Sequence, residues 1–254
     1  MTWAVTILWV WIRISAAMMA APILGSRHWS MAWRLGFSGL LAAMVWPLVQ
    51  PVSFQPTAST VIGGILSEAL IGGVLGIGVL VILSAAEMSG SLIGQMAGLQ
   101  IDLASFGEMA GQGTSARLYS WVSLVAFILI GGPELVLGSV LETFRTLPAG
   151  MAIDPQQILE LLNALVHRSL DLALRAAGPA IISILLATVA IGMIARTVPQ
   201  LNVLQTGLPS NLIVMLLALT LTLGGCVWLF IDDLPATLQG LIEGLRSSAT
   251  PIME

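Results

Sequence analysis

The chain has 254 residues, of which 57% are hydrophobic and only 9% are charged. A soluble domain carries about 25% charged residues, so this composition, with its long charge-free runs, excludes an ordinary soluble fold and indicates a membrane protein. The formal net charge is −4 and every basic residue is an arginine, which leaves no basic surface for nucleic acid.

Cysteine and histidine give no sign of a cofactor or metal site. Cys226 is the single cysteine and cannot form an intrachain disulfide. His28 and His167 lie far apart and have no partners at metal-ligand spacing, so we expect no metal and no cofactor. The first apolar run lacks a basic N-terminal region and is interrupted by Arg13, so we expect no cleaved signal peptide.

The fold class expected is an all-α membrane protein with about six hydrophobic helical segments arranged as hairpins and broken helices. The first segment covers about residues 3–24 and the second about residues 33–49. Arg13 lies near the middle of the first segment, where a charge costs about 2.5–3.5 kcal/mol on insertion scales. We therefore expect Arg13 to face protein or water instead of lipid.

The third segment covers about residues 61–98, which is longer than the roughly 20 residues that one crossing needs. Glu68 and Glu87 interrupt its apolar sequence. Glycine recurs at every fourth position near its end, and such a spacing places the glycines on one helix face, where another backbone can approach closely. These glycines are Gly90, Gly94 and Gly98, and Gly72 and Gly76 repeat the pattern earlier.

Residues 101–116 form a polar, glycine-rich break before the fourth segment. That segment covers about residues 117–141 and is interrupted at the sequence Gly-Gly-Pro-Glu of residues 131–134. A polar stretch follows over residues 142–171. It contains Asp154 and Pro155, which predict a helix start because proline suits the first helical position.

The fifth segment covers about residues 172–196, and the sixth covers about residues 208–230, closed by Asp232, Asp233 and Pro235. Between them, Pro199 and Pro209 disfavour helix, so the backbone is expected to break. The break holds several polar side chains, which are Arg196, Gln200, Asn202, Gln205 and Asn211. At membrane depth such a backbone is tolerated only where protein buries it or water lines it; a short turn at the membrane surface is the alternative.

Taken together, several stretches resemble the FliR/SctT family. The most specific is Val-Pro-Gln-Leu-Asn-Val at 198–203, followed by Gly-Leu-Pro at 207–209, an ending similar to the flagellar branch. The motif residues are Pro199, Gln200, Leu201, Asn202, Gly207 and Pro209. Further matches lie at 34–36, 68–76, 90–99, 147–150 and 174–179, so the resemblance covers nearly the whole chain.

Four positions depart from the family pattern. Thr188 stands where the family often carries an aspartate, so the usual intrachain partner of Arg196 is missing. Gly107 and Glu108 replace an Asp-Pro pair, and Ser210 replaces a common lysine. These differences concern the pairing of Arg196 and the shape of one loop.

The resemblance implies that residues 1–254 form a single integral-membrane export-gate domain without enzymatic activity. One copy would assemble with several copies of FliP and FliQ into a channel for unfolded flagellar subunits. FlhB would surround the cytoplasmic entrance and FlhA would be the energised neighbour. The resemblance places the chain in the bacterial inner membrane, in the flagellar basal body.

Three groups of residues are expected to carry this role. Arg196, Arg13 and Glu68 are expected to be buried charges at subunit contacts, and the glycines at 90, 94 and 98 are expected to pack against a neighbouring helix. Residues 103–114 are expected to plug the pore, with irregular backbone at Gly107 and closure by Phe106 and Met109, since methionine adapts its shape easily. An ordinary solvent loop is the alternative for this segment.

Other functions remain open on the sequence. An injectisome (SctT-type) export-gate subunit is the first alternative, since the sequence does not show whether the substrates are filament subunits only or effectors too. A secondary transporter would use broken helices to bind an ion or solute at the midplane, yet the sequence has no inverted internal repeat and no second broken motif that matches residues 196–211. An intramembrane enzyme would need facing catalytic groups, and the one pair available, His167 and Asp171, fits a solvated helix face better.

Overall fold

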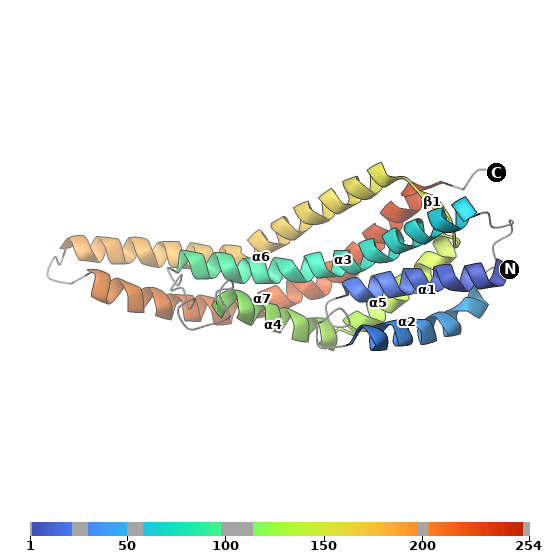
Figure 1. The fold of residues 1–254 in the computed structure, drawn as a ribbon. Coiled ribbons are helices and arrows are strands. Elements are labelled where there is room, and N and C mark those ends of the chain that lie inside the picture. The colour runs from blue at the N-terminus through green and yellow to red at the C-terminus, as the bar shows by residue number, and fades with distance from the viewer. Residues whose placement is uncertain (1, 22–29, 50–57, 98–113, 198–202, 251–254) are drawn as a thin grey trace. The chain divides into compact units, whose positions relative to one another are not determined.

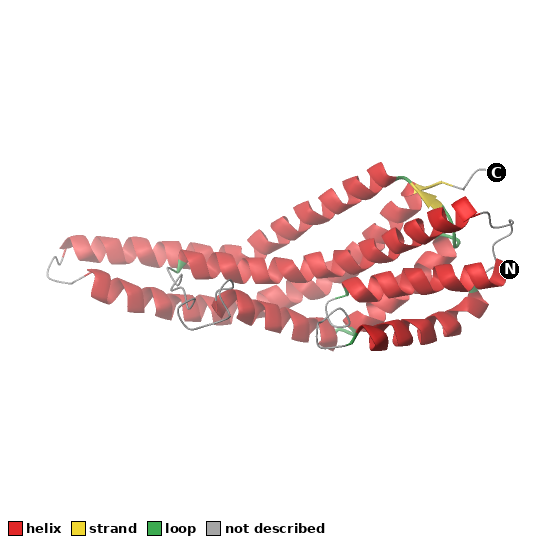
Figure 2. Ribbon diagram, in the orientation of Figure 1, coloured by secondary structure: helices red, strands yellow, loops and turns green. Residues whose placement is uncertain are grey.

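The computed structural model describes residues 2–21, 30–49, 58–97, 114–197 and 203–250. Figures 1 and 2 show that these residues are almost entirely helical. The helices are α1 (Thr2–Ala20), α2 (Met31–Val45), the 3-10 turn η1 (Trp46–Leu48), α3 (Ala58–Met96), α4 (Thr114–Leu129), α5 (Gly132–Thr146), α6 (Pro155–Thr197) and α7 (Val203–Ser248). The predicted all-α class is confirmed.

A single strand pair accompanies the helices of the described ranges. The two-residue strands β1 (Ala152–Ile153) and β2 (Ala249–Thr250) pair antiparallel. They join the connection between α5 and α6 to the end of α7, so they fasten two chain segments without forming a sheet layer.

Four described helices are long and apolar enough to cross a membrane, namely α1, α3, α6 and α7, and the interrupted pair of α4 and α5 is a fifth candidate. Helices α3, α6 and α7 contain 39, 43 and 46 residues. At 1.5 Å per residue each is roughly 60–70 Å long, about twice the thickness of the hydrocarbon core of a bilayer. Lipid tails alone therefore cannot cover the full length of these helices.

Two helix boundaries lie where the sequence predicts them. Gly131 has φ of 72°, the left-handed conformation that glycine adopts at no steric cost, and it separates α4 from α5. Pro155 begins α6, and the backbone N–H of Gln156 donates to the Asp154 carboxylate at 3.0 Å. The aspartate therefore satisfies one of the N–H groups that a helix start leaves free.

Three helices run past points where the sequence predicts an interruption or an end. Helix α6 runs without a break from Pro155 through residue 172, so the helix start predicted at Pro155 and the fifth segment belong to one helix, and α3 continues through both Glu68 and Glu87. Helix α7 passes Asp232 and Pro235 and ends only at Ser248. Pro235 removes one backbone donor, but Leu234 and Leu238 on either side are buried, and this packing outweighs the lost hydrogen bond.

The chain divides into two compact units, and α3, α6 and α7 contribute residues to both. The first unit comprises residues 1–81, 131–166 and 233–254. In it α1 packs along α2, and the Trp11 indole N–H lies 3.1 Å from the Ser38 hydroxyl oxygen. Its core combines side chains of six helices, among them Val10, Ile14, Ala42, Ile71, Leu75, Val140, Leu165, Leu241 and Leu245.

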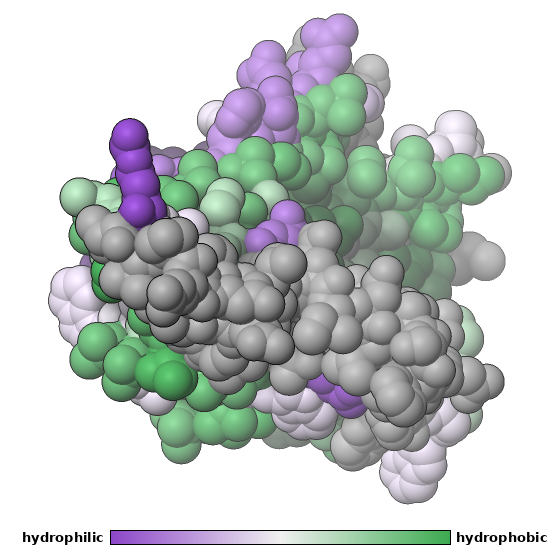
Figure 3. Space-filling model, turned by 90° about the vertical axis from the view of Figure 1, so that its left-hand side faces the viewer, coloured by the Kyte–Doolittle hydropathy of each residue, from purple (hydrophilic) through white to green (hydrophobic). Residues whose placement is uncertain are grey.

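The second unit comprises residues 82–130 and 167–232. In this unit α6 and α7 run alongside each other as a helical hairpin (Figure 1). Figure 3 shows patches of hydrophobic side chains reaching the surface. The buried side chains of this unit come from all four of its helices and include Ile93, Tyr119, Phe127, Ile184, Leu219, Cys226 and Phe230.

Candidate functional site

A buried ion pair lies in the first unit. Arg13 of α1 and Glu68 of α3 have side chains of 0% exposure. Arg13 Nε donates to Glu68 Oε2 at 2.5 Å and Nη2 donates to Oε1 at 3.0 Å. This two-pronged geometry uses the fixed fork of a guanidinium and is the strong form of an arginine–carboxylate contact.

The pair is completed by α5 and by the connection that follows it. Arg13 Nη1 donates to the Leu147 carbonyl at 3.1 Å and to the Thr143 hydroxyl at 3.3 Å. The Gly150 N–H donates to Glu68 Oε1 at 2.8 Å, and the Phe144 ring centroid lies 4.2 Å from Arg13 Cζ. The ion pair therefore joins α1, α3 and α5 and has the hydrogen bonds that a buried charge requires.

Close contact between α1 and α3 surrounds the pair. A Cβ atom at Gly72 would overlap the Arg13 carbonyl, and one at Gly76 would lie 2.5 Å from the Ala17 carbonyl oxygen. The two backbones touch at these positions, and only glycine allows such an approach. The Trp9 ring fits in the same way against Gly64 and Gly150.

The structure shows the surroundings of Arg13 and Glu68 within one chain. Arg13 is expected to face protein or water, and it faces protein, since each residue is the other's ionic partner at 0% exposure. Their expected contact with another subunit stays a prediction. The two residues are 55 positions apart in the sequence, so the sequence alone does not identify them as partners.

The glycine face of α3 is also used within the chain. A Cβ atom at Gly90 would lie 2.6 Å from the Ser115 carbonyl oxygen and 2.9 Å from Ala116 Cα, and one at Gly94 would overlap the Ser115 hydroxyl. The neighbour is thus the first turn of α4. Gly98 lies outside the described residues.

Gly90→Ala is expected to destabilise the chain by about 1–3 kcal/mol, the usual cost of overpacking, because the obstructing atoms belong to the α4 backbone. Gly73→Ala is the matched control, since no atom lies within 4 Å of the added carbon. Thermal unfolding of the purified chain should show a lower midpoint for Gly90→Ala only. Equal midpoints for both variants would contradict the close contact of α3 and α4.

The hairpin of α6 and α7 is largely uncovered. None of the side chains that the structure describes between Ile184 and Ala218 is buried. Arg196 lies in the last turn of α6 and is exposed in the single chain. Its expected burial by another subunit stays a prediction, because only one chain is present.

Several sequence-predicted residues cannot be placed. Four of the six motif residues, Pro199 to Asn202, lie outside the described ranges, while Gly207 and Pro209 lie in the first turns of α7. The expected plug over residues 103–113, with Phe106, Gly107 and Met109, also lies outside them. Position 114 is the first residue of α4.

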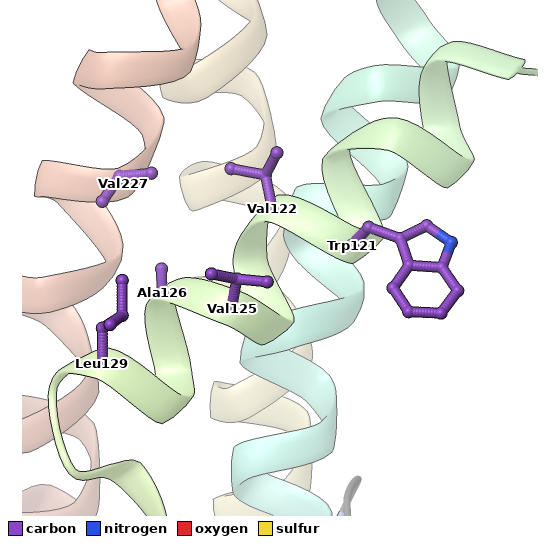
Figure 4. A pocket seen from close by; sticks show the side chains of 6 residues that line it. All are labelled: Trp121, Val122, Val125, Ala126, Leu129 and Val227. Atoms are coloured by element: carbon purple, nitrogen blue, oxygen red, sulfur yellow. The ribbon is translucent and has the colours of Figure 1, made fainter.

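A shallow groove of about 260 Å³ lies between α4 and α7 (Figure 4). Val122, Val125, Ala126 and Leu129 of α4 face Val227 of α7, and the Trp121 ring points away from Val227. Every lining side chain is hydrophobic, so the groove offers no group for acid–base or nucleophilic chemistry. Within the described ranges, no cluster of three or more His, Cys, Asp or Glu side chains can hold a metal ion.

Sequence reasoning missed two sets of contacts. Thr143, Leu147 and Gly150 complete the buried ion pair, and Tyr119 hydrogen-bonds Thr222 in the second unit. Residues 147–150 match the family pattern. This match marks the connection after α5 as a family feature, but it does not indicate that the connection binds the ion pair. Tyr119 is the single tyrosine of the chain, and its phenol in an apolar segment predicts a polar partner that the sequence does not identify.

These features define the chain as an all-α membrane protein with one ion pair sealed inside a helix bundle and an apolar surface that is only partly covered. Over residues 4–235 it matches the family described as bacterial export proteins, family 1. The chain belongs to that family.

Several curated proteins are similar along most of their length. The flagellar biosynthetic protein FliR of Bacillus subtilis (strain 168) is 27% identical over 216 residues, covering 83% of either chain. FliR of Caulobacter vibrioides is 25% identical over 227 residues, covering 88% of this chain and 90% of the relative. The secretion system apparatus protein SsaT of Salmonella typhimurium is 27% identical over 234 residues, covering 87% of either chain.

Proposed function

We propose that the chain is a subunit of the flagellar type III export gate and assembles with FliP and FliQ into the protein-conducting channel. In this proposal the whole chain acts as one integral-membrane domain of the bacterial inner membrane, within the flagellar basal body. FlhB and FlhA are its further neighbours. It performs no chemistry and instead supplies part of the channel wall.

The family and its relatives support the export apparatus. The family is described as bacterial export proteins and covers most of the chain. Relatives named as flagellar biosynthetic proteins and one named as a secretion system apparatus protein have similar identity to it. A part shared by a flagellum and a secretion system is one that moves protein, which favours a channel subunit over a filament component.

The observation that carries the proposal is the uncovered hairpin of α6 and α7. Its described side chains between Ile184 and Ala218 are unburied and mostly hydrophobic. The arm of residues 185–197 is roughly 20 Å long at 1.5 Å per residue, shorter than the hydrocarbon core of about 30 Å. Because Arg196 stands near its end and is costly in lipid, protein neighbours are the favourable cover.

Co-purification tests the assembly. An affinity-tagged chain expressed with FliP and FliQ should bring both proteins down in mild detergent. A deletion strain should lose flagellar export and regain it with the tagged chain. Recovery of export without any association with FliP and FliQ would contradict the proposed channel.

The injectisome is the second candidate, favoured by the similarity to SsaT. The two candidates differ in which substrates stop moving. In the deletion strain, loss of flagellin export with intact effector secretion supports the flagellar gate, and the reverse result supports the injectisome.

The pore plug formed by residues 103–114 remains part of the proposal. Deleting residues 106–111 should let ions and small solutes leak through the assembled channel, because this glycine-containing segment connects two helices that pack in the gate and carries the bulky side chains Phe106 and Met109. Leakage is measured by dye or potassium efflux from membranes that contain the complex. An intact complex with unchanged permeability would exclude a plug in this segment.

A further inference from the structure

The root of the α6 and α7 hairpin lies in the second unit, where α7 meets α3 and α4. Ala218 is the first side chain of α7 that the structure describes as buried, and Leu219 follows it. Before them the described arm is uncovered. The contacts just beyond Ala218 therefore decide in which direction the hairpin leaves the unit.

A side-chain hydrogen bond just beyond Ala218 joins α7 to α4. The Tyr119 hydroxyl lies 2.7 Å from Thr222 Oγ1, and the Thr222 hydroxyl lies 2.7 Å from the Ala218 carbonyl. Since the threonine proton is directed to that carbonyl, Tyr119 is the donor to Thr222. Tyr119 is 1% exposed, so its phenol has no access to water as a substitute, and losing the bond leaves a buried donor unpaired.

Two more contacts join α3 to α4 and to α7. Ser115 of α4 lies against Gly90 and Gly94 of α3. Cys226, one helical turn beyond Thr222 on α7, lies next to the Ser89 side chain of α3, whose hydroxyl donates to the Ala86 carbonyl. Helix α4 is therefore fastened to α3 by packing and to α7 by the tyrosine.

We propose that Tyr119 is a positioning residue whose hydrogen bond to Thr222 fixes the direction of the α6 and α7 hairpin and thereby the place of Arg196 in the assembly. The inference rests on the proposed function for its consequence in export, whereas the hydrogen bond and its effect on the hairpin concern this chain alone. A small rotation of α7 at Thr222 displaces the far end of the hairpin by a larger distance, because the displacement grows with the distance from Thr222.

Pulsed electron paramagnetic resonance on the full-length chain in nanodiscs measures the hairpin directly. Nitroxide labels at Met193→Cys and Met88→Cys report the distance between the exposed part of α6 and α3. The native Cys226 is buried, which protects it from the labelling reagent. In Tyr119→Phe and Thr222→Val the population at displaced distances should rise about fivefold, the effect of one net hydrogen bond. The double variant should show the same displaced population as either single variant, because both substitutions remove the same hydrogen bond.

Two variants serve as controls. Ser123→Ala removes a buried hydroxyl of α4 that bonds only within its own helix, and it should leave the distances unchanged. Thr222→Ser keeps the hydroxyl and should behave like the unmodified chain. An unchanged distance distribution in Tyr119→Phe and Thr222→Val would overturn the proposal.

Export assays separate this inference from the proposed function. With FliP and FliQ still bound, Tyr119→Phe should lower flagellin export about fivefold, and Thr222→Ser should not. Displaced distances with undiminished export would overturn the positioning role. If the unmodified chain itself fails to restore export, the proposed function fails, while the distance measurement still decides the role of Tyr119 within the chain.

Discussion

Arg13→Leu is expected to remove most of the folded chain from the membrane. The substitution leaves the Glu68 carboxylate buried at 0% exposure without its guanidinium, and breaking a buried pair in this way costs about 3–5 kcal/mol. A domain has only about 5–15 kcal/mol of stability in total. The measurement is the abundance and half-life of the tagged chain in a pulse-chase experiment.

Two companion variants separate the charge from the packing. Arg13→Leu combined with Glu68→Leu removes both charges and should recover part of the lost abundance, since no unpaired carboxylate remains. Arg13→Lys keeps the charge but loses the two-pronged contact, and it should fall in between. Wild-type abundance of the single Arg13→Leu variant would contradict the structural role of the pair.

Arg196→Leu is expected to abolish export while the chain keeps its normal abundance. Arg196 is exposed in the single chain, so the fold does not depend on it, whereas a partner carboxylate in the assembly would lose a contact whose removal costs about 3–5 kcal/mol. Arg196→Lys should retain part of the export. Flagellin in the culture medium and chain abundance are measured together.

Arg175 provides the matched control for this experiment. It lies on the same helix, is 67% exposed and pairs with Asp171 at 2.7 Å. An exposed pair of this kind contributes about 0–1 kcal/mol, so Arg175→Leu should change export little. Full export by Arg196→Leu, or an equal loss of export from both variants, would contradict the proposal that Arg196 pairs with another subunit.

Local signals in the sequence predicted the helix ends that have local causes. The Gly-Gly-Pro-Glu sequence ends α4 because a glycine adopts φ of 72° there, and Asp154 with Pro155 begins α6 through capping. Both effects arise within a few residues, so the chain sequence contains all the information they need. The same holds for the spacing of the glycines on α3, which predicts a face for close packing.

The sequence did not reveal which elements meet. The sequence predicts that Asp232, Asp233 and Pro235 close the sixth segment, yet α7 continues because buried leucines beyond them pack in the first unit. The partner of Gly90 is α4 of the same chain, and the partner of Arg13 is 55 positions away. Such pairings depend on how long helices fold back, which helical periodicity does not specify.

Site-specific photo-cross-linking at the hairpin tests the assembly most directly. A photoreactive amino acid at Leu186 or Met193, which are both exposed in the single chain, is activated in cells that express FliP and FliQ. The control position is Gln157, an exposed polar residue at the other end of α6. We predict covalent products with FliP or FliQ from the two hairpin positions, far stronger than from Gln157. Cross-links to lipid alone at Leu186 and Met193 would contradict the account, because the hairpin would then be covered without the channel subunits.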